Sequence, residues 1–249
     1  MKLSAVIITY NEERNIERCL LSIMNIVDEI LVVDSFSTDN TVDICNRYNV
    51  KVLQHAFEGY GMQKRYATEQ AKYDYVLALD ADEELSEELK KSVLRMKESG
   101  VNAPYYSFNR LNIYCGKPIK HGGWYPDRQI RIFNRRETTW SVRNVHESVE
   151  CISGVKPEHL TGDLNHYTTY SIEEHKAKER KYAAINAKAL VEKKKPISFL
   201  TPYVKGGFRF LKTYVLKLGF LDGYYGWVIA GTLAKSSYLK YKLARIELK

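Results

Sequence analysis

The chain of 249 residues has few cysteines and lacks a long apolar run. Its four cysteines, at positions 19, 45, 115 and 151, show no CxxC or other metal-site spacing, so we expect reduced thiols in a cytosolic protein. No uncharged apolar stretch approaches the roughly 20 residues that a membrane-spanning helix needs. The first residues also lack the pattern of a secretory signal, which again predicts a cytoplasmic protein.

Two glycine-rich phosphate-binding motifs are absent as well. No G-x-G-x-x-G follows the first predicted strand, and G-x-x-x-x-G-K-[ST] does not occur. The phosphates of a bound nucleotide would therefore be neutralised by side chains and a metal ion rather than by a glycine loop. Hydrophobic residues make up 45% of the chain, which is enough for a substantial core.

The first hundred residues alternate between predicted strands and helices. Short apolar runs predict strands, and apolar residues three or four positions apart predict helices. Strands are predicted at 3–9, 30–34, 50–53 and 75–80, and helices at 15–26, 41–48, 61–72 and 86–98. Alternation of this kind predicts an α/β fold with a mostly parallel sheet flanked by helices.

The rest of the chain is organised differently. Strands are predicted at 105–111 and 129–133, a polar loop at 112–128 and a short strand pair at 140–149. A long polar helix at 171–193 begins with a capping box, Ser171 to Glu174. The basic run at 193–196 marks the clearest boundary.

Positive charge is concentrated near the carboxyl terminus. Residues 1–170 carry a net charge of −3, whereas residues 171–249 carry +11. Apolar residues recur along one face of segment 199–218, with basic residues on the other, and segment 224–234 has no charge. Such amphipathic, basic and aromatic segments favour binding to an anionic membrane surface. The alternative is a helical hairpin packed on the rest of the chain with a solvated basic face.

The most informative stretch is 75–83, an apolar strand that runs directly into Asp80 and Asp82. In open α/β sheets, ligands bind at the carboxyl ends of the strands. Two carboxylates there can hold Mg²⁺, whose remaining positions are filled by water and substrate phosphates. A solvated strand end is the alternative reading.

Polar residues also follow the first two predicted strands. Asn11 and Glu12 follow strand 3–9, and Asp34 ends strand 30–34. Parallel strands present their carboxyl ends at one edge of the sheet. We therefore expect these side chains to face a base and a ribose, beside a metal–diphosphate site at Asp80 and Asp82.

These segments together resemble the family 2 glycosyltransferases of the GT-A fold. The similar segments are 6–23, 30–44, 61–68 and 75–85, in which Asp80-Ala81-Asp82 matches the D-x-D motif of that family. Segments 127–149 and 208–227 resemble its lipopolysaccharide-core branch. The resemblance implies a GT-A-type, Rossmann-like catalytic domain at 1–170, with the nucleotide-sugar site in 1–100 and the acceptor part in 101–170. It also implies a helical, basic, membrane-associating extension at 171–249.

The resemblance further implies a donor site, a cofactor and partners. The divalent cation, Mg²⁺ or Mn²⁺, would be bound by Asp82 together with Asp80. An inverting transfer from a UDP-sugar to a glycan or lipid-linked acceptor is expected, in lipopolysaccharide core or other cell-envelope polysaccharide synthesis. The protein would lie at the inner face of the cytoplasmic membrane, anchored through 199–249, and would not bind nucleic acid. The residues expected to line the nucleotide and diphosphate are Thr9, Asn11, Glu12, Asp34, Gln63, Lys64, Asp80 and Ala81.

The residues expected to bind and activate the acceptor are predicted from less specific sequence patterns. Glu147 is the predicted catalytic base, because it lies in a polar run after the predicted sheet, where the resemblance implies an acidic base. Asp127 is the second choice. The alternative for each is a loop carboxylate paired with a nearby arginine. His121, Trp124 and Tyr125 would border the acceptor or serve packing. The basic cluster would bind donor phosphates, bind an anionic acceptor, or form a charged strand face; its members are Arg128, Arg131, Arg135 and Arg136.

Two other functions are compatible with parts of the sequence. A metal-dependent nucleotidyltransferase also joins metal-binding carboxylates to a nucleotide-binding sheet, but usually shows a glycine- and lysine-rich loop near the amino end. A nucleic-acid-binding or non-catalytic membrane-binding protein would explain the basic, aromatic tail. The long apolar stretches between its basic residues suit a lipid surface better.

Overall fold

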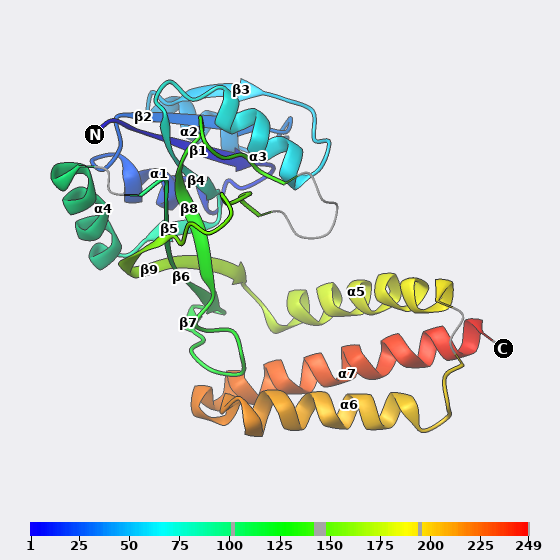
Figure 1. Cartoon of the computed structure of the whole chain (residues 1–249). Helices are drawn as coiled ribbons and strands as arrows, with labels where there is room; N and C mark the ends of the chain where they lie inside the picture. The colour runs from blue at the N-terminus through cyan, green and yellow to red at the C-terminus, as the bar shows by residue number, and fades with distance from the viewer. Residues whose placement is uncertain (101–102, 142–147, 194–195, 249) are drawn as a thin grey trace. The chain divides into compact units, whose positions relative to one another are not determined.

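A computed structural model describes residues 1–100, 103–141, 148–193 and 196–248 (Figure 1). The strands are β1 (Leu3–Thr9), β2 (Glu29–Asp34), β3 (Lys51–Gln54), β4 (Tyr75–Asp80), β5 (Glu83–Leu85), β6 (Tyr105–Tyr114), β7 (Lys117–Pro118), β8 (Arg128–Asn134) and β9 (Glu158–Thr169). The α-helices are α1 (Ile16–Ile23), α2 (Thr41–Arg47), α3 (Tyr60–Glu69), α4 (Glu87–Ser99), α5 (Ile172–Glu192), α6 (Thr201–Leu211) and α7 (Gly223–Glu247). A π-helical turn, η1 (Lys212–Leu216), and a 3₁₀ helix, η2 (Gly219–Asp222), connect α6 to α7.

The strands form one mixed sheet in the order β3-β2-β1-β4-β8-β6-β9-β5, with β7 paired to β6. β1 pairs in parallel with β2 and β4, and β2 pairs in parallel with β3. Beyond β4 the direction changes, because β8 is antiparallel to both β4 and β6, and β5 is antiparallel to β9. The predicted α/β architecture is confirmed, and the parallel pairs join β3, β2, β1 and β4, whereas the β4–β8, β8–β6 and β5–β9 pairs are antiparallel. A loop rather than a helix connects β6 to β8, and antiparallel neighbours allow such a connection.

Three strands were not predicted. β5 and β7 are only three and two residues long. β9 mixes exposed and buried positions without strict alternation and contains Gly162. That glycine has φ +97°, and a Cβ there would lie 2.3 Å from the backbone nitrogen of Leu89 at the start of α4. A polar, glycine-containing strand of this kind lacks the periodicity by which strands are recognised.

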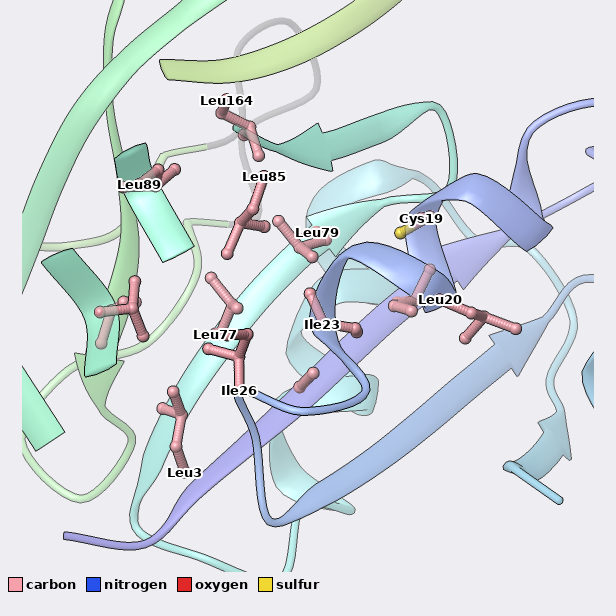
Figure 2. Close-up of a cluster of buried hydrophobic side chains, with 14 of the residues drawn as sticks. Leu3, Cys19, Leu20, Ile23, Ile26, Leu77, Leu79, Leu85, Leu89 and Leu164 are labelled. Carbon is pink, nitrogen blue, oxygen red and sulfur yellow. The ribbon is translucent and has the colours of Figure 1, made fainter. Parts of the chain in front are cut away.

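Apolar side chains cover both faces of the parallel strands. On one face, residues of β1 and β4 pack against α1, α2 and α4; Figure 2 shows Leu3, Leu77 and Leu79 of the strands beside Leu20 and Ile23 of α1. On the other face, Val6, Leu31 and Val76 pack with Ala67 of α3. Every residue of β1 is buried. Because both faces of these strands are covered, polar side chains lie at the edge of the sheet, in the residues that follow the strands.

The chain divides into two compact units. The first comprises Met1–Arg110 and Asp127–His166, and the second comprises Leu111–Pro126 and Tyr167–Lys249. This division differs from a single boundary at residue 170. In the second unit, the backbone nitrogens of Lys120 and His121 donate to the Asp222 carboxylate, at 3.2 and 2.8 Å. These hydrogen bonds tie the 112–126 loop to the helices that follow in the sequence.

In the second unit, α5, α6 and α7 lie side by side (Figure 1). α6 packs on α7 through small residues: a Cβ added at Gly206 would lie 3.2 Å from the carbonyl oxygen of Ala234. The predicted capping box is present at the start of α5, where Ser171 accepts from the Glu174 nitrogen. None of the described helices combines the length and apolar character needed to cross a membrane.

Candidate active site

Asn11 follows β1 and is held by the loop that follows β2. Its backbone nitrogen donates to Ser37 Oγ at 2.8 Å, and its side-chain Oδ1 accepts from the Thr38 nitrogen at 2.8 Å. Asn11 has φ +54°, a left-handed conformation that asparagine tolerates better than most residues. The two strand ends are therefore joined as predicted, and the Asn11 side chain fixes the loop.

Asp34, at the end of β2, is fully buried. Its Oδ2 accepts from the Ser37 nitrogen at 2.9 Å, and its Oδ1 accepts from the Ser37 hydroxyl. The carboxylate thus stabilises the turn at 34–37. Each carboxylate oxygen retains further acceptor capacity, so this role is compatible with the predicted contact to a ribose.

Thr9 and Glu12 lie beside the same edge. Thr9 is buried, and its hydroxyl has no hydrogen-bond partner among the described residues. Glu12 Oε2 accepts from Asn15 Nδ2 at 2.6 Å. Burial raises the pKa of Glu12 above its ordinary value, although the hydrogen bond from Asn15 opposes this effect.

Gln63 and Lys64 both project from α3, but their contacts differ. Gln63 is 1% exposed; its Nε2 donates to Ser35 Oγ at 3.0 Å, and its Oε1 lies 2.8 Å from His55 Nδ1. Its amide connects the segments that follow β2 and β3 to α3. Lys64 is also buried, and its Nζ lies 2.9 Å from Asp80 Oδ1. Of this predicted pair, Lys64 is the residue that reaches the D-x-D motif.

Asp80 is the centre of a buried ion cluster that the sequence alone did not predict. In addition to Lys64, Arg131 Nη2 donates to Asp80 Oδ2 at 3.0 Å. Arg131 also donates to Glu83 Oε1, while Glu83 Oε2 accepts from the Asp80 nitrogen at 3.0 Å. Arg131 and Glu83 are 3% and 1% exposed. Asp80, the first aspartate of the D-x-D motif, is therefore fixed by a network that extends from α3 to β8.

The surroundings of Asp80 and Glu83 shift the pKa values of these two carboxyl groups in opposite directions. Although burial alone raises the pKa of Asp80, the charges of Lys64 and Arg131 hold that pKa well below its ordinary value. Burial raises the pKa of Glu83, because the lowering effect of Arg131 is partly offset by the negative Asp80. Asp80 therefore favours its ionised form and is already paired with two cations.

Asp82 contacts one histidine, whereas Asp80 is paired with two cations, although both aspartate side chains are 25% exposed. Ala81, between the two aspartates, is buried, whereas the Asp82 side chain is 25% exposed. Its Oδ2 lies 3.2 Å from His166 Nε2 of β9, opposite Glu83 in the strand register. His166 was not recognised from the sequence, because β9 was not predicted.

The donor set around Asp82 fits a hard divalent cation that shares its coordination with a substrate. The described residues contain no group of three or more His, Cys, Asp or Glu side chains arranged to bind a metal. Mg²⁺ usually needs only one or two protein carboxylates when phosphate oxygens and water complete its shell. Asp82 can supply one such oxygen, whereas the cations on Asp80 compete with a metal for that carboxylate.

Of the two residues predicted as the catalytic base, the structure describes only Asp127. Glu147 lies outside the described residues, as does His146. Asp127 Oδ2 accepts from Arg110 Nε and Nη2 at 2.9 and 2.8 Å, and its Oδ1 accepts from Gln129 Nε2 at 2.7 Å. Asp127 therefore has the paired geometry of the alternative interpretation, with Arg110 as its partner instead of the arginines that were considered.

The 112–126 loop places its aromatic residues within the second unit. His121 Nδ1 lies 2.9 Å from Asp222 Oδ1. Trp124 contacts Tyr114 edge-on, with 6.0 Å between the ring centroids. These contacts agree with the packing interpretation of Trp124. The basic cluster is also divided: Arg131 is buried in the ion cluster, whereas Arg136 is exposed and pairs with Asp74 at 2.8 Å.

Comparisons with known proteins identify the family to which this chain belongs. The family model described as glycosyl transferase family 2 matches residues 4–160, more than half of the chain. An uncharacterised glycosyltransferase of Rickettsia typhi is 33% identical, over 100% of this chain and 88% of its own length. The lipopolysaccharide core biosynthesis glycosyltransferase LpsC of Rhizobium meliloti is 28% identical, over 98% of this chain and 94% of its own.

A solved structure, S. aureus TarS, is 31% identical over 46% of this chain and 22% of its own, with a TM-score of 0.35. The match to the family model and the full-length similarity to the Rickettsia glycosyltransferase agree with the mixed sheet and its flanking helices. The chain belongs to glycosyl transferase family 2, a family of enzymes with the GT-A fold.

Proposed function

We propose that this glycosyltransferase inverts the anomeric centre while transferring a sugar from a UDP-sugar to a hydroxyl group of a glycan or glycolipid. The acceptor would belong to the lipopolysaccharide core or another cell-envelope polysaccharide, as the full-length similarity to LpsC suggests. The single observation that carries the proposal is the geometry after β4. There, Asp80 is paired with Lys64 and Arg131, whereas Asp82, which is equally exposed, contacts only His166 among the described charged residues.

The polar residues have separate roles in this proposal. Asn11, Glu12 and Asp34 lie at the nucleotide side of the edge, and Asp82 would hold Mg²⁺ or Mn²⁺ against the diphosphate. When bound, the cation neutralises the charge that develops on the departing diphosphate. Lys64 and Arg131 fix Asp80, and the preorganised positive charge of Lys64 also favours an anionic leaving group.

The direct test is a screen of nucleotide-sugars with Mg²⁺ or Mn²⁺, measuring hydrolysis products and thermal stabilisation. Release of UDP from a UDP-sugar is the expected result. Formation of pyrophosphate would instead indicate nucleotidyl transfer. Stabilisation by GDP-sugars alone would contradict the choice of nucleotide while leaving glycosyl transfer in place.

Replacing Glu147 with glutamine is expected to reduce sugar transfer by about a hundredfold or more, because a positioned general base contributes at least that factor. Donor binding should remain, since the proposed role of Glu147 concerns only the acceptor proton. Transfer rate and UDP affinity should be measured on the same preparation. An active Glu147→Gln variant, together with an inactive Asp127→Asn variant, would move the base to Asp127.

We also propose that the second unit binds the surface of an anionic membrane, at the cytoplasmic face. α6 packs on α7 through small residues, so its apolar stripe points away from α7. The stripe is 45% to 62% exposed and comprises Leu200, Val204, Phe208, Leu211 and Val215. Lys205, Arg209 and Lys212 are exposed beside it. An apolar stripe flanked by cations is typical of helices that lie in the membrane interface.

Replacing both Phe208 and Leu211 with serine is expected to weaken binding to phosphatidylglycerol-containing vesicles by about a hundredfold. The estimate takes about 3 kcal/mol for two apolar side chains that no longer enter the lipid. Both side chains are exposed, so the helix should remain folded. The matched control is Leu21→Ser with Met24→Ser, two exposed apolar residues of the first unit. Equal vesicle sedimentation of both double variants would refute the stripe as the anchor.

A further inference from the structure

A pocket of about 380 Å³ lies in the first unit beside the ion cluster. Its walls come from α3, β6 and β8, together with Trp140, Ser148 and Val149. Four cationic side chains line it: Lys64, Arg110, Arg128 and Arg131. A concentration of cations in one small cavity indicates a negatively charged ligand.

Two buried N–H donors in the lining have no partner among the described residues. They are Trp140 Nε1 and Arg131 Nε, each on a residue that is 3% exposed. Leaving a buried donor unpaired costs free energy, and such groups are rare in folded proteins unless a ligand or water satisfies them. Both donors belong to the pocket wall, so a ligand with several acceptor oxygens would remove this cost.

The charges of the pocket are only partly neutralised by the protein. Lys64 and Arg131 pair with Asp80, and Arg110 pairs with Asp127. Arg128 is exposed, and its side chain forms no ion pair or hydrogen bond with the residues that the structure describes. Arg128 therefore supplies a cation, and Trp140 and Arg131 supply N–H donors, that no described residue pairs with.

The sheet order separates this pocket from the nucleotide side of the edge. β1 and β2 lie on one side of β4, whereas β8 and β6 lie on the other. The polar groups after β1 and β2 are amide and acidic, namely Asn11, Glu12 and Asp34, and they suit a base and a ribose. The pocket on the β8 side is cationic and favours an anionic group, whereas the polar groups after β1 and β2 suit the uncharged base and ribose.

We propose that this pocket binds a phosphate group carried by the acceptor. The inference rests on the proposed function, since it assigns the donor to the β1–β2 side and the acceptor to the β8 side of Asp80. A phosphate has enough acceptor oxygens to accept from Trp140 Nε1, Arg131 Nε and the Arg128 guanidinium together. The acceptor is then a phosphorylated glycan or glycolipid rather than a neutral one.

The test is a calorimetric titration of the full chain with methyl phosphate, carried out with UDP and Mg²⁺ present at saturation. Methyl phosphate should bind while UDP remains bound. Arg128→Gln is expected to weaken methyl phosphate about tenfold, which corresponds to losing one charge-assisted hydrogen bond. Trp140→Phe, which removes only one N–H donor, should weaken it severalfold. Arg136→Gln is the matched control, because it removes an arginine outside the pocket, and it should leave the affinity unchanged.

Three results would overturn the proposal. Competition between methyl phosphate and UDP would assign the pocket to the donor diphosphate. Equal affinity in Arg128→Gln and Arg136→Gln would place the anion elsewhere, and an absence of methyl phosphate binding would remove the site. If UDP itself does not bind, the proposed donor is wrong. If UDP does not bind but Arg128→Gln loses methyl phosphate binding, the pocket is still identified as an anion site.

Discussion

Replacing Asp82 with asparagine is expected to reduce metal-dependent donor turnover by about 10³-fold while leaving the fold intact. Asparagine has the shape of aspartate and can keep a hydrogen bond to His166, which lies 3.2 Å away. It lacks the negative charge that a divalent cation requires from its ligand. The proposed role of that cation is to stabilise the departing diphosphate, an effect that contributes several kcal/mol to catalysis.

Three measurements on this variant give a sharp answer. UDP release reports turnover, thermal unfolding reports the fold, and Mn²⁺ binding in the presence of UDP reports the metal site without relying on activity. Asp74→Asn is the matched control: this exposed aspartate precedes β4 and pairs with Arg136, at the opposite end of the strand from Asp82. Near-normal turnover by Asp82→Asn would exclude Asp82 as the metal ligand.

Replacing Arg131 with methionine is expected to lower the free energy of unfolding by about 3–5 kcal/mol. Arg131 is the only described cation whose guanidinium contacts both Asp80 and Glu83 within 3.0 Å. Methionine fills similar volume but leaves Glu83 buried and without a charged partner at that distance. Removing one member of a buried ion pair costs this much because the remaining charge is neither hydrated nor compensated.

The pH dependence distinguishes buried charge from lost packing in the Arg131→Met variant. The pKa of Glu83 is already raised by burial, and the loss of Arg131 should raise it further. A carboxyl group whose folded-state pKa exceeds its unfolded value binds more protons in the folded state, so stability falls as pH rises between the two values. The deficit of the variant, measured by chemical denaturation, should therefore be smaller at pH 5 than at pH 8.

Arg136→Met is the control for this comparison, because Arg136 is exposed and pairs only at the surface with Asp74. Its effect should be within about 1 kcal/mol, which is typical of surface ion pairs. An Arg131→Met variant as stable as this control would show that the ion cluster does not hold the site together. A deficit independent of pH would attribute the loss to packing instead.

Periodicity and strand-end chemistry were sufficient to predict which residues gather at the proposed nucleotide side of the sheet edge. β1, β2 and β4 are short apolar runs, and their ends at Asn11, Asp34 and Asp80 are polar. Parallel strands place such ends together, so the grouping followed from local patterns and one general rule of sheet geometry. The same patterns predicted α1 to α4 and the capped start of α5.

Only the tertiary structure decided the partners of those residues. Arg131 and His166 reach Asp80 and Asp82 from β8 and β9, strands that lie about 50 and 80 residues further along the chain and that pair without a distinctive pattern. β9 is half polar, and nothing local indicates which strand it joins.

The exposure of the α6 stripe was likewise decided by packing, because Gly206 brings α6 close to α7 and leaves the larger apolar side chains outside. Asp80-Ala81-Asp82 could thus be predicted from the sequence to bind a metal ion. That Asp80 is already paired with two cations while Asp82 remains available depends on long-range contacts, which sequence spacing does not encode.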